Sequence, residues 1–565
     1  MEYMDRNVLN KWGPFLLSLC LGIWLALIAI LPPSPKSMDA SQDQFSAARA
    51  MEDIRVIAAK PHPTGSEENT KVRAYLLTRL KALGFEASTR TEQLPERPLA
   101  RLNSWSGEDA ASQAFVNVIG VKPGKDRTKP AVLLMAHHDT VWGSPGAADD
   151  TIGIASIFEI LRAVNTAEQA ERDIIVLFTD AEELGLVGAR HFFASNPLRK
   201  SVGAIINFEA RGGGGTANMF QTSADNGNTA RLFAKSVKQP STSSLSTFVY
   251  NVLPNDTDLT PALESDYVAF NIANIGKAEY YHSPKIDTEA LQVSTLQHMG
   301  SQGLDLTRAL LSAENFPAPK RDATFFDVFG LFTIIYAPAF GWAFILFTLI
   351  GLSLSYDKRG SHTDIFTGAL RMVGFLILGG GLLFLLNLLS GAGRGADYYD
   401  RLAAISELQL MAGFAGLAVL LLFFGRKALS ANGLIGAALP LLLLGILGQA
   451  FAPTASYFIV LAVMLFAVTT AVQRKMKTRW APALLPTIVV GYMLGLFHLL
   501  MVGVGPDMPS VAILPLALLT LAVLPLYPGT QSRAGNGLAL IGSGLSVAIA
   551  LWIRLDPIAS TVPLY

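Results

Sequence analysis

The stretch "AVLLMAHHDTVWGSPGAADDTIGIASIFEILRAV" (residues 131–164) decides the fold of the chain around it. A short, continuously apolar run leads into a polar loop, which is followed by apolar residues at helical spacing. Two more apolar runs, 173–183 and 202–210, come after it. Strands that are apolar on both faces and alternate with helices indicate a buried, mostly parallel sheet. We therefore expect an α/β domain of three αβα layers with a mostly parallel mixed sheet.

Side chains that can bind metal stand where each of the three apolar runs ends. In open sheets of this type, ligands bind at the carboxyl ends of the strands. One acidic residue at a strand end is just as often a turn former or a helix cap. Three adjacent strands that all end in acidic residues or histidine are harder to explain by turns alone. The residues concerned are His137 and Asp139, then Asp180, Glu182 and Glu183, and then Glu209.

This pattern contains the groups that a site with two zinc ions needs. Such a site uses histidine nitrogens and carboxylate oxygens, one bridging carboxylate, and a free carboxylate as general base. His137 and Asp139 offer a ligand and a partner on the same face that fixes its orientation. Asp149 lies in a glycine-rich loop just before a helix, where the backbone can approach an ion closely. Glu182 and Glu183 point in different directions, so one can bind metal while the other stays free.

The composition divides the chain into a soluble part and a membrane part. Of the 565 residues, 51% are hydrophobic and 16% are charged, whereas soluble domains carry roughly 25% charged residues. Residues 34–325 have an ordinary soluble composition, with amphipathic helices expected over 46–60 and 68–84, and 326–565 is mostly apolar. The formal net charge of zero gives no indication of a nucleic-acid partner. Cys20 is the single cysteine, which excludes a secreted fold held by disulfides.

The apolar segments predict nine membrane spans. Segment 12–33 is long enough to cross a bilayer and has no cleavage site, so 1–33 is expected to hold a cytoplasmic N-terminus and an uncleaved anchor. In the all-α part that follows, every loop expected in the cytoplasm carries Lys or Arg. This charge asymmetry predicts that residues 34–325 lie on the non-cytoplasmic side of the membrane. Asn387 and His498 are the polar residues found well inside these spans, His498 is interpreted as a packing residue, and no transport pathway is evident. The eight further segments are 327–352, 366–389, 404–425, 431–450, 454–473, 482–504, 509–527 and 535–553.

Four ordered motifs resemble those of the clan MH zinc aminopeptidases. They are "AHHDTVWGSPGAADDTIGIASIFEILR", "FTDAEELGLVGARHF", "NFEARGGGG" and "YYHSPKIDT", and the upstream "PHPTGSEENTKVRAYLLTRLKALGF" is similar to the family's opening. With the nine-span layout, the chain resembles the branch of Fxna-type endoplasmic-reticulum metallopeptidases and vacuolar membrane proteases. The resemblance implies a zinc-exopeptidase-like domain followed by a polytopic membrane domain.

The resemblance also implies a role for each matching residue. Glu182 would be the general base, Tyr281 would stabilise the oxyanion, and Asp139 would orient a histidine ligand. Glu209 stands where many members of the family have Asp, although the Fxna-type branch is similar in having Glu there. Two Zn²⁺ ions per chain would be bound as follows: His137 and Glu209 on the first, Glu183 and His282 on the second, and Asp149 on both.

These observations favour a membrane-anchored dizinc metallopeptidase, most simply an aminopeptidase, whose partners are a peptide or protein substrate and the lipid bilayer. A glutaminyl-cyclase-like zinc enzyme and a catalytically silent receptor or scaffold are alternatives on the same fold. A peptidase domain that regulates a transporting membrane domain is a third. We expect a bacterial inner membrane with a periplasmic catalytic domain, or alternatively a vacuolar or reticular membrane with a lumenal one. Oligomeric state and substrate identity are left open.

Overall fold

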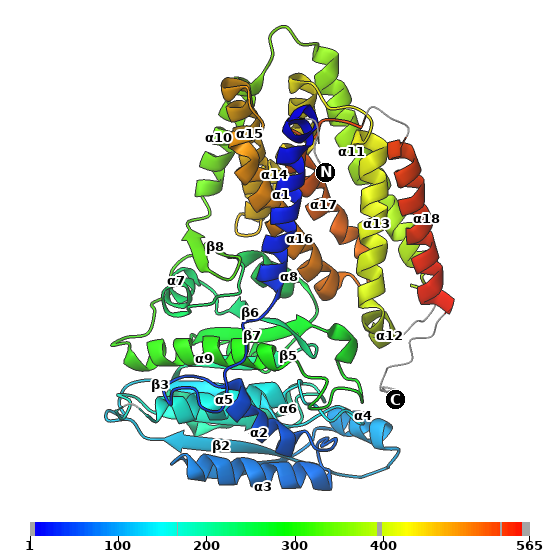
Figure 1. The fold of residues 1–565 in the computed structure, drawn as a ribbon. Coiled ribbons are helices and arrows are strands. Elements are labelled where there is room, and N and C mark those ends of the chain that lie inside the picture. The colour runs from blue at the N-terminus through cyan, green and yellow to red at the C-terminus, as the bar shows by residue number, and fades with distance from the viewer. Residues whose placement is uncertain (1–5, 167, 393–397, 531–533, 556–565) are drawn as a thin grey trace. The chain divides into compact units, whose positions relative to one another are not determined.

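The computed structural model describes residues 6–166, 168–392, 398–530 and 534–555 (Figure 1). The chain divides into two compact units. Residues Leu31–Ile335 form the first, here called the sheet unit. Residues Met1–Ile30 and Tyr336–Ala559 form the second, here called the helical unit.

A seven-stranded sheet in the order β1-β2-β4-β3-β5-β7-β6 forms the centre of the sheet unit. Its four central strands run parallel to one another, whereas β1, β2 and β6 pair with their neighbours in antiparallel fashion. The predicted α/β fold with a mixed sheet is therefore confirmed. The strands are β1 (Glu86–Gln93), β2 (Ala114–Lys122), β3 (Ala131–His137), β4 (Ile174–Thr179), β5 (Val202–Ala210), β6 (Gly214–Thr222) and β7 (Val268–Gly276).

The register of the central strands aligns their carboxyl ends. His137, the last residue of β3, pairs with Thr179, the last residue of β4. Met135 pairs with Asn207 two residues before Glu209, which in turn pairs with Ala273 on β7. Because paired residues share a face and side chains alternate along a strand, His137 and Glu209 emerge side by side.

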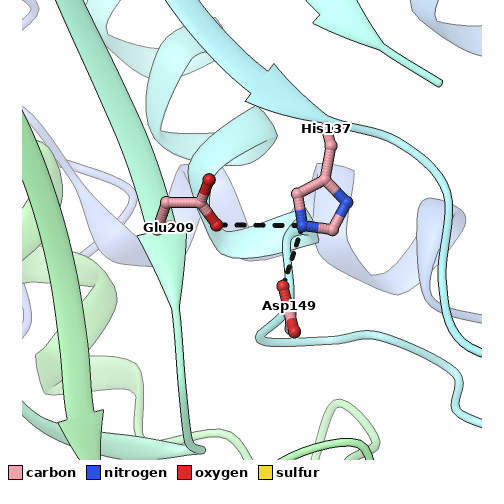
Figure 2. A group of neighbouring side chains, drawn as sticks. All are labelled: His137, Asp149 and Glu209. Carbon is pink, nitrogen blue, oxygen red and sulfur yellow. Dashed lines mark hydrogen bonds and ion pairs between the residues drawn. The ribbon is translucent and has the colours of Figure 1, made fainter. Parts of the chain in front are cut away.

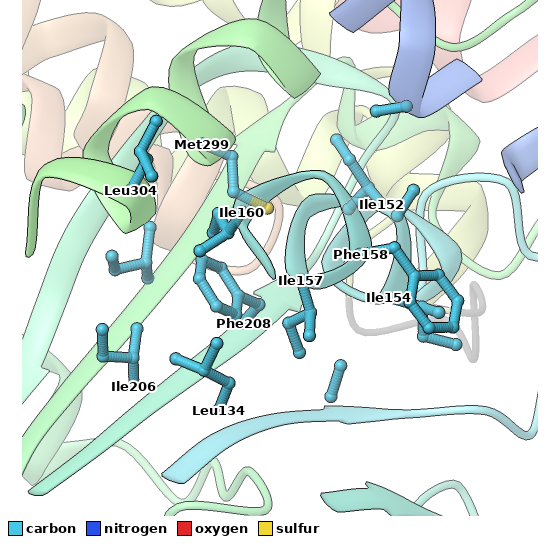
Figure 3. Close-up of a cluster of buried hydrophobic side chains, with 14 of the residues drawn as sticks. Leu134, Ile152, Ile154, Ile157, Phe158, Ile160, Ile206, Phe208, Met299 and Leu304 are labelled. Atoms are coloured by element: carbon cyan, nitrogen blue, oxygen red, sulfur yellow. The ribbon is translucent and has the colours of Figure 1, made fainter. Parts of the chain in front are cut away.

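Helices cover both faces of the sheet and make two hydrophobic cores. On one face, α5 packs against α2 and α9, and alternate strand residues such as Leu134, Ile206 and Phe208 fill the layer between (Figure 3). Every residue of α5 except Arg162 is buried. On the other face, α6 covers the alternating set that includes Met135. The helices of this unit are α2 (Ala47–Ile57), α3 (Glu67–Ala82), α4 (Glu96–Ser106), α5 (Thr151–Val164), α6 (Val187–Ser195), α7 (Gly227–Ser236), α8 (Ser244–Val252) and α9 (Val293–Ser312).

The helix boundaries follow local capping chemistry. Ser46 and Ser66 cap α2 and α3, since each side chain accepts a hydrogen bond from a backbone N–H in the first turn. Gly84 follows α3 with a φ of 81°, the left-handed conformation that ends helices. The helices expected over 46–60 and 68–84 are therefore present, with slightly earlier ends.

The helical unit contains seven helices that are long and apolar enough to cross a membrane, counted over the described residues. The chain is therefore a multi-pass membrane protein. Two of the nine expected spans are shorter apolar helices, α10 (Phe340–Ser355) and α17 (Ile513–Val523). The remaining helices of the unit are α1 (Arg6–Ile30), α11 (His362–Leu389), α12 (Tyr398–Ala403), α13 (Ile405–Phe424), α14 (Ala431–Phe451), α15 (Tyr457–Met476), α16 (Leu484–Val504) and α18 (Ala534–Leu555).

The expected span 327–352 is wrong over its first part. Residues Thr324–Val328 and Phe332–Tyr336 form strands β8 and β9 of a separate two-stranded sheet, and the helix begins only at Phe340. The segment "TFFDVFGLFTIIY" is mostly apolar, with Asp327 as its one charged residue, and an apolar run without periodicity fits a strand as well as a helix.

The core against α5 yields a stability prediction. Phe158 is fully buried and meets Phe178 edge-to-face, with ring centroids 5.3 Å apart. Replacing Phe158 by Ala should lower the free energy of unfolding of the sheet unit by about 3–5 kcal/mol, because it removes the apolar contact and leaves a cavity. Val56 on α2 is 51% exposed and provides the control. Val56→Ala should change the free energy of unfolding by less than about 0.5 kcal/mol. Urea-dependent proteolysis of the full chain measures both, and equal midpoints would contradict the assignment of this core.

Candidate metal centre

The structure brings all five predicted ligands together at the carboxyl end of the sheet. Two of them stand on strands, and the other three are carried by the loops that follow or precede the neighbouring elements. Each side chain is buried. The five are His137 at the end of β3, Asp149 before α5, Glu183 after β4, Glu209 on β5, and His282 after the short 3-10 turn Ala278–Tyr280.

Asp149 lies between the two histidines. Its Oδ1 is 2.9 Å from His137 Nε2, and its Oδ2 is 3.1 Å from His282 Nε2. Glu209 Oε2 approaches His137 Nε2 at 3.9 Å, and Figure 2 shows the two carboxylates converging on this nitrogen. Glu183 Oε1 lies 3.1 Å from His282 Nε2. Two sets of three ligands, which share Asp149, are therefore compact enough to hold one ion each, with all ligand atoms of a set within 4.8 Å.

The hydrogen bond of His137 fixes which of its nitrogens faces the cluster. Its Nδ1 lies 3.0 Å from the backbone oxygen of Asp139, and an oxygen can only accept. Nδ1 therefore donates a proton, and Nε2 faces Asp149 and Glu209. A histidine nitrogen between two carboxylates needs a positive charge beside it, which either its own proton or a bound metal ion supplies, so the donor set fits a metal.

Glu183 provides a second test of whether these residues fit a metal ion. Its Oε1 is buried, and no group in the described chain donates a hydrogen bond to it. This oxygen lies 3.1 Å from His282 Nε2. A buried carboxylate oxygen that receives no hydrogen bond is costly, and coordination to a cation removes that cost. Histidine nitrogens and carboxylate oxygens are the ligands that zinc takes in co-catalytic sites.

Charge crowding raises the pKa of several carboxyls in the cluster. Burial, followed by the nearby carboxylates of Asp258 and Asp149, raises the pKa of Glu209 to about 8 against the opposing effect of His137. Burial also raises the pKa of Glu183, and that of Glu182 to well above its usual value. The cluster therefore holds more negative charge than it can stabilise alone, and bound cations would balance it.

Asp139 connects the end of β3 to the loop after β4. Besides the backbone contact, its Oδ1 lies 3.6 Å from His137 Nδ1. The same carboxylate accepts hydrogen bonds from the backbone N–H groups of Glu182 at 3.0 Å and Glu183 at 3.2 Å. Asp139 thus positions one histidine and both glutamates, a wider contribution than orienting His137 alone.

Glu182 and Glu183 diverge as their adjacency predicts. Glu183 is buried, whereas Glu182 is only half-buried and reaches toward His137. The turn that carries them is closed by hydrogen bonds from the N–H groups of Gly185 and Leu186 to the Glu182 carbonyl, both 2.8 Å. Ala181 just before it has a φ of 60°, a strained value for a residue with a Cβ, which sites of chemistry often tolerate.

The structure places Tyr281 directly beside a ligand. Its ring stacks on that of His282, with centroids 3.8 Å apart and planes at 25°. Tyr281 is half-buried at the edge of the cluster. Its hydroxyl is carried on the same short segment as His282, and this placement is compatible with the role that the resemblance implies.

Three other acidic or histidine residues of the motifs have structural partners instead. His138 Nε2 faces the Val116 carbonyl at 3.0 Å, away from the cluster. Asp150 caps α5, accepting from the Gly153 N–H at 3.2 Å, and follows Asp149 through a cis peptide bond. Asp180, counted among the metal-capable strand ends, accepts instead from the Thr64 hydroxyl and from the Val116 N–H, both at 2.8 Å.

Asp258 belongs to the cluster but was missed by the sequence analysis. It is fully buried, and the hydroxyl of Thr179, the strand neighbour of His137, donates to its Oδ2. Its Oδ1 has no hydrogen-bond partner among the described residues. Burial raises its pKa to about 6, and its charge contributes to the raised pKa values of Glu182 and Glu209. In the sequence, Asp258 lies in a loop with no strand end or motif to mark it.

Comparison with known proteins identifies the sheet unit. Residues 117–307 match the model of Peptidase family M28, so the chain carries a Peptidase M28 domain and the resemblance read from its motifs is confirmed. It is 27% identical over 330 residues to endoplasmic reticulum metallopeptidase 1 of Homo sapiens, and 30% identical over 310 residues to the vacuolar membrane protease of Schizosaccharomyces pombe. These matches cover 56% and 54% of this chain but only 36% of each relative.

The chain was also compared with solved structures. The aminopeptidase from Aneurinibacillus sp. strain AM-1 is 16% identical with a TM-score of 0.38, covering 50% of this chain and 99% of its own. The glutaminyl cyclase of Porphyromonas gingivalis is 17% identical with a TM-score of 0.38, covering 47% and 99%.

The raised pKa of Glu209 predicts how the metal-free protein responds to pH. Its carboxyl titrates near 4.5 in the unfolded chain and at about 8 in the folded one. Between these values the folded state holds a proton that the unfolded state has released, so rising pH favours unfolding. The melting temperature of chelator-treated protein should therefore fall as the pH is raised from about 5 to about 8.

Scanning fluorimetry of the full chain in detergent measures this slope. Glu209→Gln should flatten it, whereas Glu264→Gln, at an exposed position, should leave it unchanged. Added zinc should restore the melting temperature at the alkaline end. A slope that Glu209→Gln does not alter would contradict the assigned pKa.

Proposed function

We propose that this chain is a membrane-anchored metallopeptidase that binds two Zn²⁺ ions and removes residues from the amino terminus of peptides. One observation carries the proposal: Asp149 has one oxygen facing His137 and the other facing His282, beside the half-buried Glu182. The Peptidase family M28 match over residues 117–307 supports the same class of reaction. The names of the two relatives, a metallopeptidase and a protease, support it as well.

The ligands divide between two ions that share a carboxylate. His137 and Glu209 would hold the first, Glu183 and His282 the second, and Asp149 both. When bound, zinc would lower the pKa of a coordinated water and polarise the carbonyl of the scissile bond.

Glu182 would move the proton during hydrolysis. Its carboxylate is the one acidic group of the "DAEE" turn that remains partly accessible. It would accept a proton from the attacking water and return it to the amide nitrogen of the leaving residue, so that one water is consumed for each bond cleaved. Burial and the surrounding carboxylates raise its pKa well above the usual value, which brings it closer to the operating pH of a general acid and base.

Tyr281 and Asp139 would assist without exchanging protons with the substrate. The Tyr281 hydroxyl would donate to the oxygen of the tetrahedral intermediate, a contribution that grows as negative charge develops there. Asp139 would hold the Glu182–Glu183 turn through the two backbone N–H groups that it binds. It is a positioning residue, since its contacts are to the protein.

An excess of negative charge favours attack at the amino terminus. Asp258 and Glu182 are carboxylates beyond the ligand set, and both interact with Glu209. A protonated α-amino group of a peptide would compensate this charge, whereas the interior of a chain brings none.

The basic loops of the helical unit support a non-cytoplasmic sheet unit. Asp357, after α10, pairs with Arg474 near the end of α15 at 3.4 Å and donates its N–H to Asn432 at the start of α14. Lys11 of α1 lines the same surface hollow as Lys477. Because loops rich in Lys and Arg face the cytoplasm, we place this end inside. The sheet unit follows the other end of α1, in a bacterial periplasm or in a lumen.

Product analysis with a base-deficient variant tests this function. The full chain should release free residues in order from unblocked peptides and leave N-acetylated ones intact. Glu182→Gln should keep two zinc atoms per chain by elemental analysis but lower the rate by a factor of about 10²–10⁴, since proton transfer is lost. The exposed Glu264 serves as control, and Glu264→Gln should leave the rate unchanged.

Three results would each overturn a part of the proposal. Internal cleavage of blocked peptides would exclude an aminopeptidase. One zinc per chain together with cyclisation of amino-terminal glutamine would favour a glutaminyl-cyclase-like enzyme. Activity that survives Glu182→Gln would exclude Glu182 as the base.

Asp258 provides a prediction on the pH profile. Its negative charge raises the pKa of Glu182, so Asp258→Asn should move the acid limb of kcat/KM to lower pH. The neighbouring Asp256 is exposed, and Asp256→Asn should leave the profile in place. A loss of activity in Asp258→Asn without a shift of the acid limb would indicate a structural role only.

A further inference from the structure

Exposed apolar side chains of the sheet unit gather in one short region. In the described part of residues 31–335, eight large apolar side chains are exposed. Single exposed apolar residues are ordinary on a protein surface, but a cluster indicates a site of interaction. Five of the eight lie on α8 and on the segment that leads into β9: Phe248, Val252, Leu331, Phe332 and Ile334.

The segment alternates between an inner and an outer face. Ile335 packs against the hydrophobic core, whereas Phe332 is 53% exposed and Ile334 is 38% exposed. This is the period of two expected of a strand with one buried face. Residues 328–336, "VFGLFTIIY", include no charged side chain, so nothing opposes burial of the outer face in an apolar medium.

The turn before β9 is a fixed structure. Phe329 and Gly330 have φ values of 52° and 72°, and the N–H of Leu331 donates to the Val328 carbonyl at 3.0 Å. Asp327 closes the turn by accepting from the Gly330 N–H at 2.9 Å and ties it to Thr242, whose N–H donates at 3.0 Å. Leu331, 67% exposed, is therefore presented to its surroundings by a defined backbone.

The adjoining helix α8 is joined to this hairpin through β8. The Ser244 hydroxyl bonds to both backbone groups of Phe325, its oxygen accepting from the N–H and its proton going to the carbonyl, both at 3.1 Å. Phe248 and Val252 are four residues apart and so share one face of α8. The exposed residues of both elements thus belong to one packed substructure.

The far end of β9 is attached to the membrane helices. Tyr336 meets Phe344 of α10, with ring centroids 5.4 Å apart. The carbonyl of Pro338, just before α10, accepts from Gln449 at the end of α14 at 2.9 Å. This end of the helical unit lies opposite its basic loops, and the exposed Trp342 fits the aromatic belt of a membrane surface.

The length of β9 restricts its direction relative to the membrane. Phe332 precedes Tyr336 by four residues, or about 13 Å of extended strand. The headgroup region on each side of a bilayer is roughly 5–8 Å thick. A strand that rises along the membrane normal would carry Phe332 through this region into water, whereas a strand along the surface keeps its whole outer face in contact with lipid.

We propose that the turn and β9 lie along the non-cytoplasmic surface of the bilayer, with Leu331, Phe332 and Ile334 inserted at the level of the headgroups and upper acyl chains. The lipid bilayer is the partner because it is already the surroundings of the helix to which β9 is joined. This contact with lipid is independent of what the site of the sheet unit catalyses.

Site-specific quenching tests this arrangement in the full chain. Cys20 is the single cysteine, so Cys20→Ser provides a background in which Leu331→Cys or Phe332→Cys can carry an environment-sensitive fluorophore. Ser88→Cys, at an exposed position of the edge strand β1, is the matched control. The protein is reconstituted in phosphatidylcholine nanodiscs with or without brominated acyl chains.

Labels at 331 and 332 should emit at shorter wavelength than the label at 88. Brominated lipid should quench them several-fold more strongly, and iodide in the buffer several-fold less. Quenching by iodide equal to that at 88 would overturn the proposal, because the residues would then face water. Protection from both quenchers would overturn it as well, because protein would then cover them. Thermal unfolding of each labelled variant, compared with Cys20→Ser alone, shows that the substitutions leave the fold intact.

Discussion

A single carboxylate holds the site together. Each oxygen of Asp149 faces the Nε2 of a different histidine, at 2.9 and 3.1 Å. The loop that delivers it depends on Gly146, where a Cβ would come within 2.4 Å of the Thr140 side chain and 2.8 Å of the Asp149 carbonyl. The next residue, Asp150, caps α5, so the first turn of a fully packed helix fixes the position of the carboxylate.

The sheet converts distant sequence positions into neighbouring side chains. β3 lies between β4 and β5, and the shared register places the ends of all three at one edge. Asp139 then holds the turn after β4 through two backbone hydrogen bonds. The result is a compact set of predicted ligands with one less buried glutamate, Glu182, at its margin, and the proposed metal-assisted hydrolysis would need this division of roles.

Strand β9 spans the boundary between the two units of the chain. β9 belongs to the sheet unit over most of its length, yet its last residue packs on α10. Its exposed side chains, Phe332 and Ile334, are among those that we propose to contact lipid.

Local sequence determined the elements whose information is local. The apolar runs at β3, β4 and β5, the helical period of α5 and the amphipathic patterns of α2 and α3 all lie within the elements they specify, and each was predicted. The ligand positions at strand ends followed from the same runs, whereas His282 and Tyr281 were recognised only through the family's motif.

The tertiary structure alone decided the features that depend on distant partners. Asp258 joins the site because it packs against Thr179, 79 residues earlier in the chain, and no local pattern records that contact. The segment 324–336 became a hairpin because Asp327 and Ser244 bind it to the sheet unit, although its apolar composition suits a membrane helix equally well.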